Sequence, residues 1–247
     1  MRMRSSRQSW SRENSVAVAT GICTNMRMKF TPRSLSYLAG VCLGVTALAG
    51  TAQGQGFYLN ADMGVALGDD VKLRQFIVPL SGVDLELDPG VRVSVAGGYN
   101  FNDYVGVQLE TGLIHHEVDG VNGSGNIDAS LGHVPLLADV VFRYDQPDCR
   151  FVPYLGAGAG GDVSVIELDH VFAPNGSRVD GSGSDLVFAW QVFAGARYKL
   201  NDAMSIGAGY KFFSAEGASW EVRHTSGDIE SGKARVHSVG VDFNLKF

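Results

Sequence analysis

The chain has 247 residues, of which 45% are hydrophobic, 19% are charged and 32 are glycine. The charged fraction is below the roughly 25% of an average soluble domain. Beyond residue 52, 13 Lys and Arg stand against 25 Asp and Glu, a net charge of −12 that disfavours a nucleic-acid partner, because phosphate contacts need basic patches.

The N-terminal part of the chain carries the pattern of an export signal. A basic start at 26–30 precedes an apolar run at 35–49, and small residues follow. This order is typical of a secretory signal peptide. The alternative is a transmembrane helix, since the run is about as long as the shortest spans of roughly 17 residues, but the small residues and the polar, glycine-rich sequence after it favour cleavage. We expect residues 26–52 to be cleaved, residues 1–25 to be an unstructured extension or a misassigned start, and residues 53–247 to form the mature domain.

Eight segments of the mature chain alternate between apolar and polar residues. In the first, 57–67, the apolar Leu59 and Ala61 alternate with the polar Asn60 and Asp62. A period of two is the signature of a β-strand. The other seven segments are 91–101, 104–113, 133–144, 151–161, 186–198, 205–213 and 237–247.

The connections between these segments alternate strictly between short and long. The long ones, 68–82, 115–131, 162–185 and 214–234, are rich in Gly, Ser, Asp and Asn and are predicted to be loops. Transmembrane barrels have short periplasmic turns and long extracellular loops. The pattern therefore predicts an all-β fold, an eight-stranded antiparallel up-and-down transmembrane β-barrel.

Three features favour lipid around the apolar face. Each segment has about 9–11 residues, and up to 13 in 186–198, whereas a tilted strand needs 9–11 to cross a bilayer. The opposite face is polar and rich in glycine, which suits a narrow lumen, and eight strands close at a diameter that side chains can fill. Aromatic residues, which suit the membrane–water boundary, gather near the short turns: Phe57, Phe101, Tyr144, Phe151, Tyr198 and Phe247.

Several stretches together resemble a known family. GFYL near the start, DPGVRVSVAGGYNFND, VPLLADVVFRY, PYLGAGAG and the terminal VDFNLKF, taken in this order, resemble the eight-stranded outer-membrane β-barrels. That family includes opacity-type surface proteins and the membrane domain of OmpA-like proteins. The resemblance implies a monomer in the outer membrane of a Gram-negative bacterium, in contact with lipid and lipopolysaccharide. It also implies that the last strand is an assembly signal for the barrel-assembly machinery, carried by Val239, Val241, Phe243, Leu245 and Phe247.

A glycine motif in the fifth segment has two interpretations. Gly156, Gly158 and Gly161 match the dinucleotide fingerprint G-x-G-x-x-G. That fingerprint requires a helix after the glycines, and no helical pattern follows Gly161. We expect instead that Gly156, Gly158 and Gly160 share the inner face and leave room for bulky neighbours such as Phe193, Phe213, Arg197 or Lys211. No cofactor is predicted.

Charged residues in mid-strand positions of the polar face are the candidate site. Buried charges must pair or be neutralised, so these side chains are expected to form a luminal network that plugs the barrel. The alternative is a gated narrow pore. The predicted members are Asp62, Arg92, Glu110, Asp139, Arg143, Arg197, Lys211 and Asp242.

The most direct functional hypothesis is a surface protein with a structural or adhesive role, acting through four acidic loops on an unidentified surface ligand. The alternatives are a narrow small-solute pore and a lipid A-modifying enzyme. His237-Ser238 resembles the His and Ser of lipid A deacylases, but adjacent strand residues point to opposite faces, so no catalytic residues are predicted. His115-His116 are expected in a solvated loop without a third metal ligand, and no metal site is predicted.

Overall fold

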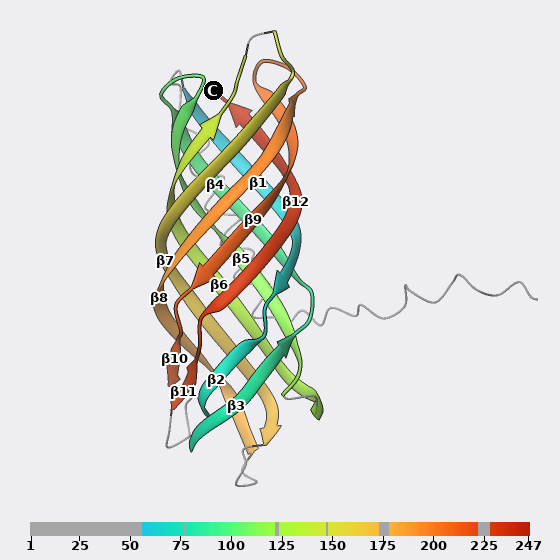
Figure 1. Ribbon diagram of the computed structural model, residues 1–247, viewed down its shortest axis with the longest axis vertical. Coiled ribbons are helices and arrows are strands. Elements are labelled where there is room, and N and C mark those ends of the chain that lie inside the picture. Colours follow the sequence, from blue (N-terminus) through green and yellow to red (C-terminus); the bar gives the residue numbers. More distant parts are fainter. Residues whose placement is uncertain (1–55, 77, 122–123, 147, 173–177, 222–227) are drawn as a thin grey trace, which may run out of the picture. The chain divides into compact units, whose positions relative to one another are not determined.

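The computed structural model describes residues 56–76, 78–121, 124–146, 148–172, 178–221 and 228–247. The predicted extension 1–25 and signal peptide 26–52 lie outside these residues. All regular structure in the described ranges is β-strand (Figure 1). None of the described residues belongs to a helix that could cross a bilayer.

Eight of the strands close into one antiparallel ring. Around the ring the order is β1, β4, β5, β6, β7, β8, β9 and β12, and β12 pairs with β1. The predicted fold class is confirmed. The bounds of these strands are β1 (Phe57–Gly68), β4 (Gly90–Asn100), β5 (Val105–Val121), β6 (Ser124–Arg143), β7 (Phe151–Phe172), β8 (Arg178–Lys199), β9 (Met204–Ala215) and β12 (Ala234–Lys246).

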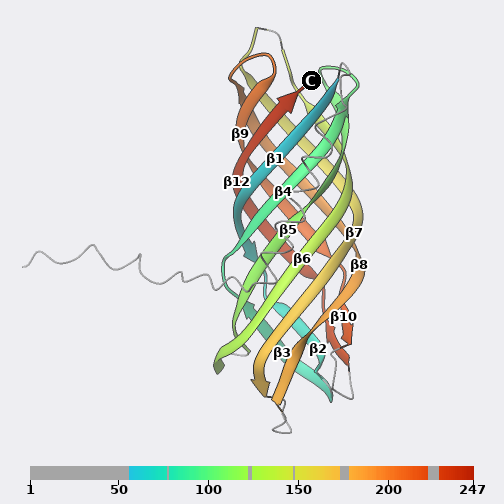
Figure 2. The same cartoon turned by 180° about the vertical axis from the view of Figure 1, so that it is seen from behind.

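Four further strands extend the wall of the barrel beyond short interruptions in the strand structure. They are β2 (Val71–Phe76), β3 (Val78–Leu87), β10 (Ser219–Glu221) and β11 (Asp228–Ser231). They pair in the order β10, β11, β2, β3 and β5, at the end of the barrel away from the C-terminus (Figures 1 and 2). The long connections therefore contain strands as well as loops. These segments form strands because their inward apolar side chains pack together in a separate cluster.

The two faces of the ring carry opposite kinds of side chain. Leu109 is 63% exposed on the outside, whereas its neighbour Glu110 is fully buried inside. The same contrast separates Val140 from Asp139 and Trp190 from Gln191. An apolar exterior and a polar interior are the distribution that lipid requires of a barrel. The closed ring also pairs the backbone groups that hydrocarbon would leave unsatisfied.

The predicted aromatic belt lies at the short turns. All six of its residues have exposed side chains, from Phe57 on β1 to Phe247 after β12. Phe57 packs edge-on against Tyr99 with ring centroids 4.9 Å apart, and Phe151 packs against Tyr198 at 5.3 Å. A belt of aromatic side chains is typical of the boundary between hydrocarbon and water, which we therefore expect at this end of the barrel.

The glycine motif lies within one uninterrupted strand. Because β7 continues from Gly161 to Phe172, no helix follows the motif and a dinucleotide site is excluded. A Cβ atom at Gly156 would collide with the Phe193 ring, as expected. One at Gly158 would collide with Asp139, which is not among the bulky neighbours expected from the sequence.

Gly160 supplies a test of this close packing. A Cβ atom there would collide with the carbonyl oxygen of Leu136, which the strand pairing holds in place. Gly160→Ala is expected to lower the free energy of unfolding by about 1–3 kcal/mol, since overpacking of this kind forces backbone shifts. Gly97→Ala is the control, because nothing lies within 4 Å of its Cβ position. Equal urea midpoints for the two variants would contradict the prediction.

Candidate functional site

The lumen holds four charged side chains in direct contact, which we call the ion-pair core. Glu110 of β5 lies at its centre and accepts from Arg92 of β4 at 2.5 Å and from Lys211 of β9 at 2.8 Å. Lys211 also donates to Asp62 of β1 at 2.6 Å. Two carboxylates thus face two cations, and their charges balance inside the barrel.

Neutral side chains extend the ion-pair core to Asp139. Gln108 donates to one carboxylate oxygen of Asp139 at 2.8 Å, and Gln191 donates to the other at 2.9 Å. The carbonyl oxygen of Gln191 accepts from Arg92 at 3.1 Å. Asp139 is therefore held by amides, without a cation of its own among the described residues.

A second ion pair lies nearer the short turns. Arg197 of β8 forms a salt bridge with Asp242 of β12, and its guanidinium also donates to Asn60 at 3.1 Å. Tyr154 donates to Asp242 at 3.0 Å, and its ring lies 4.3 Å below the guanidinium carbon. Arg143, the eighth predicted member, stays apart and donates to the backbone carbonyl of Asn102.

A clamp at the turn end joins three parts of the ring. Asp145, in the turn after β6, pairs with Lys199 at 2.5 Å and with Lys246 of β12. Lys199 also donates to the carbonyl oxygen of Gln146 at 2.8 Å. Burial alone would raise the pKa of Asp145, but the hydrogen bonds from the two lysines bring that pKa below its ordinary value.

The clamp predicts a response to acid. Because the folded-state pKa of Asp145 is depressed, its contribution to stability is present above its unfolded pKa of about 3.9 and is lost as the pH falls through the folded value. Asp145→Asn should therefore lower the urea midpoint at pH 7 and have a smaller effect at pH 2–3. An effect of the same size at both pH values would contradict this assignment.

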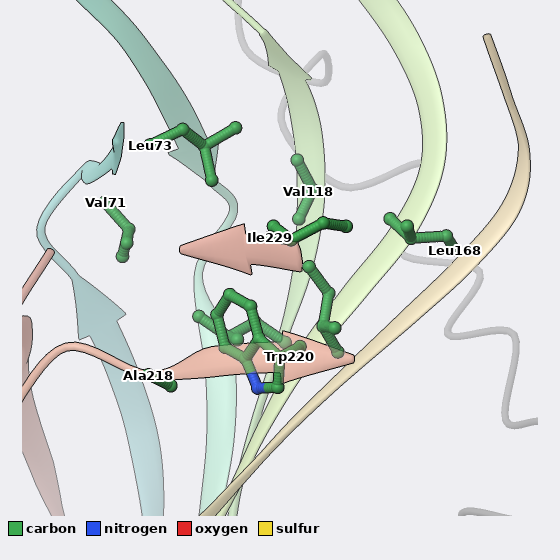
Figure 3. Packing of buried hydrophobic residues seen from close by; sticks show 9 residues of the cluster. Val71, Leu73, Val118, Leu168, Ala218, Trp220 and Ile229 are labelled. Atoms are coloured by element: carbon green, nitrogen blue, oxygen red, sulfur yellow. The ribbon is translucent and has the colours of Figure 1, made fainter. Parts of the chain in front are cut away.

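Two apolar clusters close the lumen on the side away from the turns. The inner cluster contains Ala66, Ile114, Leu137, Ala189, Phe213, Ala215, Ala234 and Val236. The outer cluster contains Val71, Leu73, Val118, Leu131, Ile166, Leu168, Ala218, Trp220 and Ile229 (Figure 3). Trp220 is 1% exposed, and its indole nitrogen donates to the carbonyl oxygen of Ser164 at 3.1 Å.

A buried His–Asp pair lies between the two clusters. His133 of β6 and Asp162 of β7 approach to 2.6 Å, and both are buried. The expectation of a solvated loop at His115-His116 is wrong, because both belong to β5 and His116 is fully buried, 3.0 Å from the carbonyl oxygen of Asp88. Every second residue of β7 points inward, so the alternation that places Gly160 inside would also have predicted Asp162 inside.

The residues considered for catalysis or metal binding do not come together. The His237 side chain is 41% exposed on the outside of the ring, whereas Ser238 is 4% exposed on the inside. Within the described residues, no three His, Cys, Asp or Glu side chains are grouped to hold a metal ion. Cys149 is a free, exposed thiol near the start of β7.

Residues 35–247 match the family model described as the outer membrane protein beta-barrel domain. The chain belongs to this outer-membrane β-barrel family. Outer membrane protein PagN of Salmonella typhimurium is 34% identical over 98 residues, which are 38% of this chain and 40% of PagN. The match thus spans about two fifths of this curated relative.

A solved structure shows the same fold. The outer membrane protein OprG from Pseudomonas aeruginosa is 18% identical, with a TM-score of 0.51 over 80% of this chain and all of OprG. Neisserial surface protein A is also 18% identical, with a TM-score of 0.49 over 78% of this chain and 98% of that protein. Family membership places this β-barrel in the outer membrane of a Gram-negative bacterium, so the short turns face the periplasm and β2, β3, β10 and β11 face the outside.

Proposed function

We propose that this barrel is a non-catalytic surface protein with a structural or adhesive role, which acts through its extracellular strands. The observation that carries the proposal is the closed lumen. A solute would have to pass the outer apolar cluster, the inner apolar cluster and then the ion-pair core. Each layer is filled by buried side chains from opposite sides of the ring.

The extracellular half offers a structured surface for contact. Strands β7 and β8 have 22 residues each, whereas 9–11 are enough to cross the hydrocarbon. About half of each strand therefore stands outside the membrane. Exposed carboxylates such as Asp69, Asp70, Asp88 and Glu117 give this part an acidic character, which favours a partner with a basic surface.

The last strand supports a proposal about assembly. The outward-facing residues of β12 form an apolar stripe that includes Val239, Val241 and Phe243, and all three are exposed on the ring. We propose that this stripe, with Leu245 and Phe247, is what the barrel-assembly machinery recognises before the ring closes. The same outward face then lies against lipid, and the extracellular rim lies beside lipopolysaccharide.

Conductance separates the proposed closed barrel from a pore. The refolded full chain in planar bilayers should give no steady current steps, because no continuous water path crosses the three filled layers. Reproducible steps that persist in the full chain would overturn the closed-lumen proposal.

Adhesion can be tested on whole cells. Bacteria that display the full chain should bind beads coated with a polycationic peptide better than bacteria displaying a variant in which Asp69, Asp70 and Asp88 are replaced by Asn and Glu117 by Gln. Beads coated with a neutral polymer are the control. Equal binding by both strains would contradict a role for these four carboxylates.

A further inference from the structure

The periplasmic mouth of the lumen contains a hollow that the surface role does not use. It measures about 440 Å³, including the part open to solvent. Residues from β1, β6, β8 and β12 line it, together with the turn after β8. The lining includes Arg143, Asp145, Arg197, Lys199, Asn244 and Lys246.

Positive charge exceeds negative charge around this hollow. Four cationic side chains line it, against the two carboxylates of Asp145 and Asp202. Asp145 already holds both lysines, and Arg197 is paired with Asp242. Arg143 is different, because its partner among the described residues is a backbone carbonyl rather than a carboxylate. The carboxylates of Asp145 and Asp103 favour its charge without forming a salt bridge to it, so the guanidinium can still pair with an anion from outside the chain.

Two hydrogen-bond donors in the hollow have no partner among the described residues. One is the Nε atom of Arg143, and the other is the amide nitrogen of Asn244, whose residue is 3% exposed. Buried polar groups are nearly always hydrogen-bonded, so such donors need a partner from outside the protein. Both line the same hollow, beside the cationic side chains.

We propose that this hollow binds an oxyanion, a carboxylate or phosphate group presented from the periplasm. A guanidinium donates to the oxygens of such a group in a planar fork, and an amide N–H adds a directed hydrogen bond. Excess positive charge disfavours a metal cation. The inference goes beyond the surface role, since it concerns the opposite end of the barrel.

The test uses the ¹⁵N-labelled full chain, refolded in an uncharged maltoside detergent that contains no phosphate. Inorganic phosphate and acetate are titrated separately at constant ionic strength, while the side-chain amide signal of Asn244 is followed. A saturable shift of this signal is expected with at least one of the two anions. A signal that does not saturate with either anion overturns the proposal.

Variants locate the site. Arg143→Gln should weaken anion binding at least tenfold, and Asn244→Asp should abolish it by placing a negative charge in the hollow. Binding to these variants is read from backbone amides of the turn after β8. Lys233→Gln is the matched control, because Lys233 is a cation at the extracellular rim, paired with Glu216 at 2.7 Å. Heat-modifiable gel mobility verifies that each variant is folded. If Arg143→Gln and Lys233→Gln bind equally well, the proposal fails.

The source of the oxyanion is resolved in phosphatidylglycerol nanodiscs. If the Asn244 signal is already at its bound position without added phosphate, a lipid headgroup supplies the oxyanion. If it moves only when free anion is added, the ligand is soluble. Either result supports the site, whereas an Asn244 signal that stays at its free position under both conditions overturns it.

Discussion

Replacing Glu110 with alanine is expected to destabilise the barrel by about 3–5 kcal/mol, the usual cost of removing one partner from a buried ion pair. Arg92 and Lys211 would then face each other with only Asp62 to balance them. Both cations are largely buried, so water cannot replace the lost carboxylate. The measurement is the free energy of unfolding in urea, with the protein refolded into lipid vesicles.

Glu216→Ala is the matched control for Glu110→Ala. It removes a carboxylate that pairs with Lys233 at 2.7 Å, but both side chains are about half exposed. Exposed pairs contribute roughly 0–1 kcal/mol, so this variant should unfold almost as the wild type does. A Glu110→Ala variant within about 1 kcal/mol of the wild type would mean that the ion-pair core does not hold the strands together.

Trp220→Ala is expected to lower the free energy of unfolding by about 3–5 kcal/mol, as is typical for truncating a buried aromatic residue. Its indole is enclosed by Ile229, Leu168 and the other members of the outer apolar cluster, and its hydrogen bond to Ser164 would also be lost. The damage should stay local, because this cluster is separate from the inner one. Hydrogen exchange should therefore accelerate in β2, β10 and β11 and remain slow in β1 and β12.

Trp190→Ala is the control for this variant. Trp190 lies on β8 but points outward, with its ring 5.4 Å from that of Phe212. Its loss should leave exchange in β10 and β11 unchanged. Equal acceleration in both variants, or a uniform loss of protection from exchange around the ring in Trp220→Ala, would contradict an independent extracellular cluster.

The sequence pattern was sufficient for the transmembrane ring. Alternation such as that of Leu109 with Glu110 depends only on neighbouring residues. Once one residue of a strand is assigned to the lipid or the lumen, the faces of the others follow from the period of two. The same pattern placed Asp139 and Lys211 inside. It predicted neither which luminal side chains pair with each other nor the order of the apolar and charged layers in the lumen. Both depend on how the strands are staggered around the ring.

The contacts that were missed are those that depend on distant strands. Glu110 and Lys211 lie on β5 and β9, which are not neighbours in the ring, and they meet only across the lumen. The extracellular strand β2 was missed because its pairing with β3 shifts register between Leu73 and Gln75, which interrupts the period of two. The clamp on Asp145 combines residues from a turn and two strand ends.

Short non-strand segments separate β1 from β2, β3 from β4, β9 from β10, and β11 from β12. They divide the chain into parts that tolerate sequence change to different degrees. Strands β5 to β8 run through both halves, so an insertion in them would displace membrane-spanning residues. The β2–β3 and β10–β11 hairpins are instead separate strand pairs on the extracellular side of the bilayer. Their sequences can therefore diverge while the register of the strands in the ring stays the same.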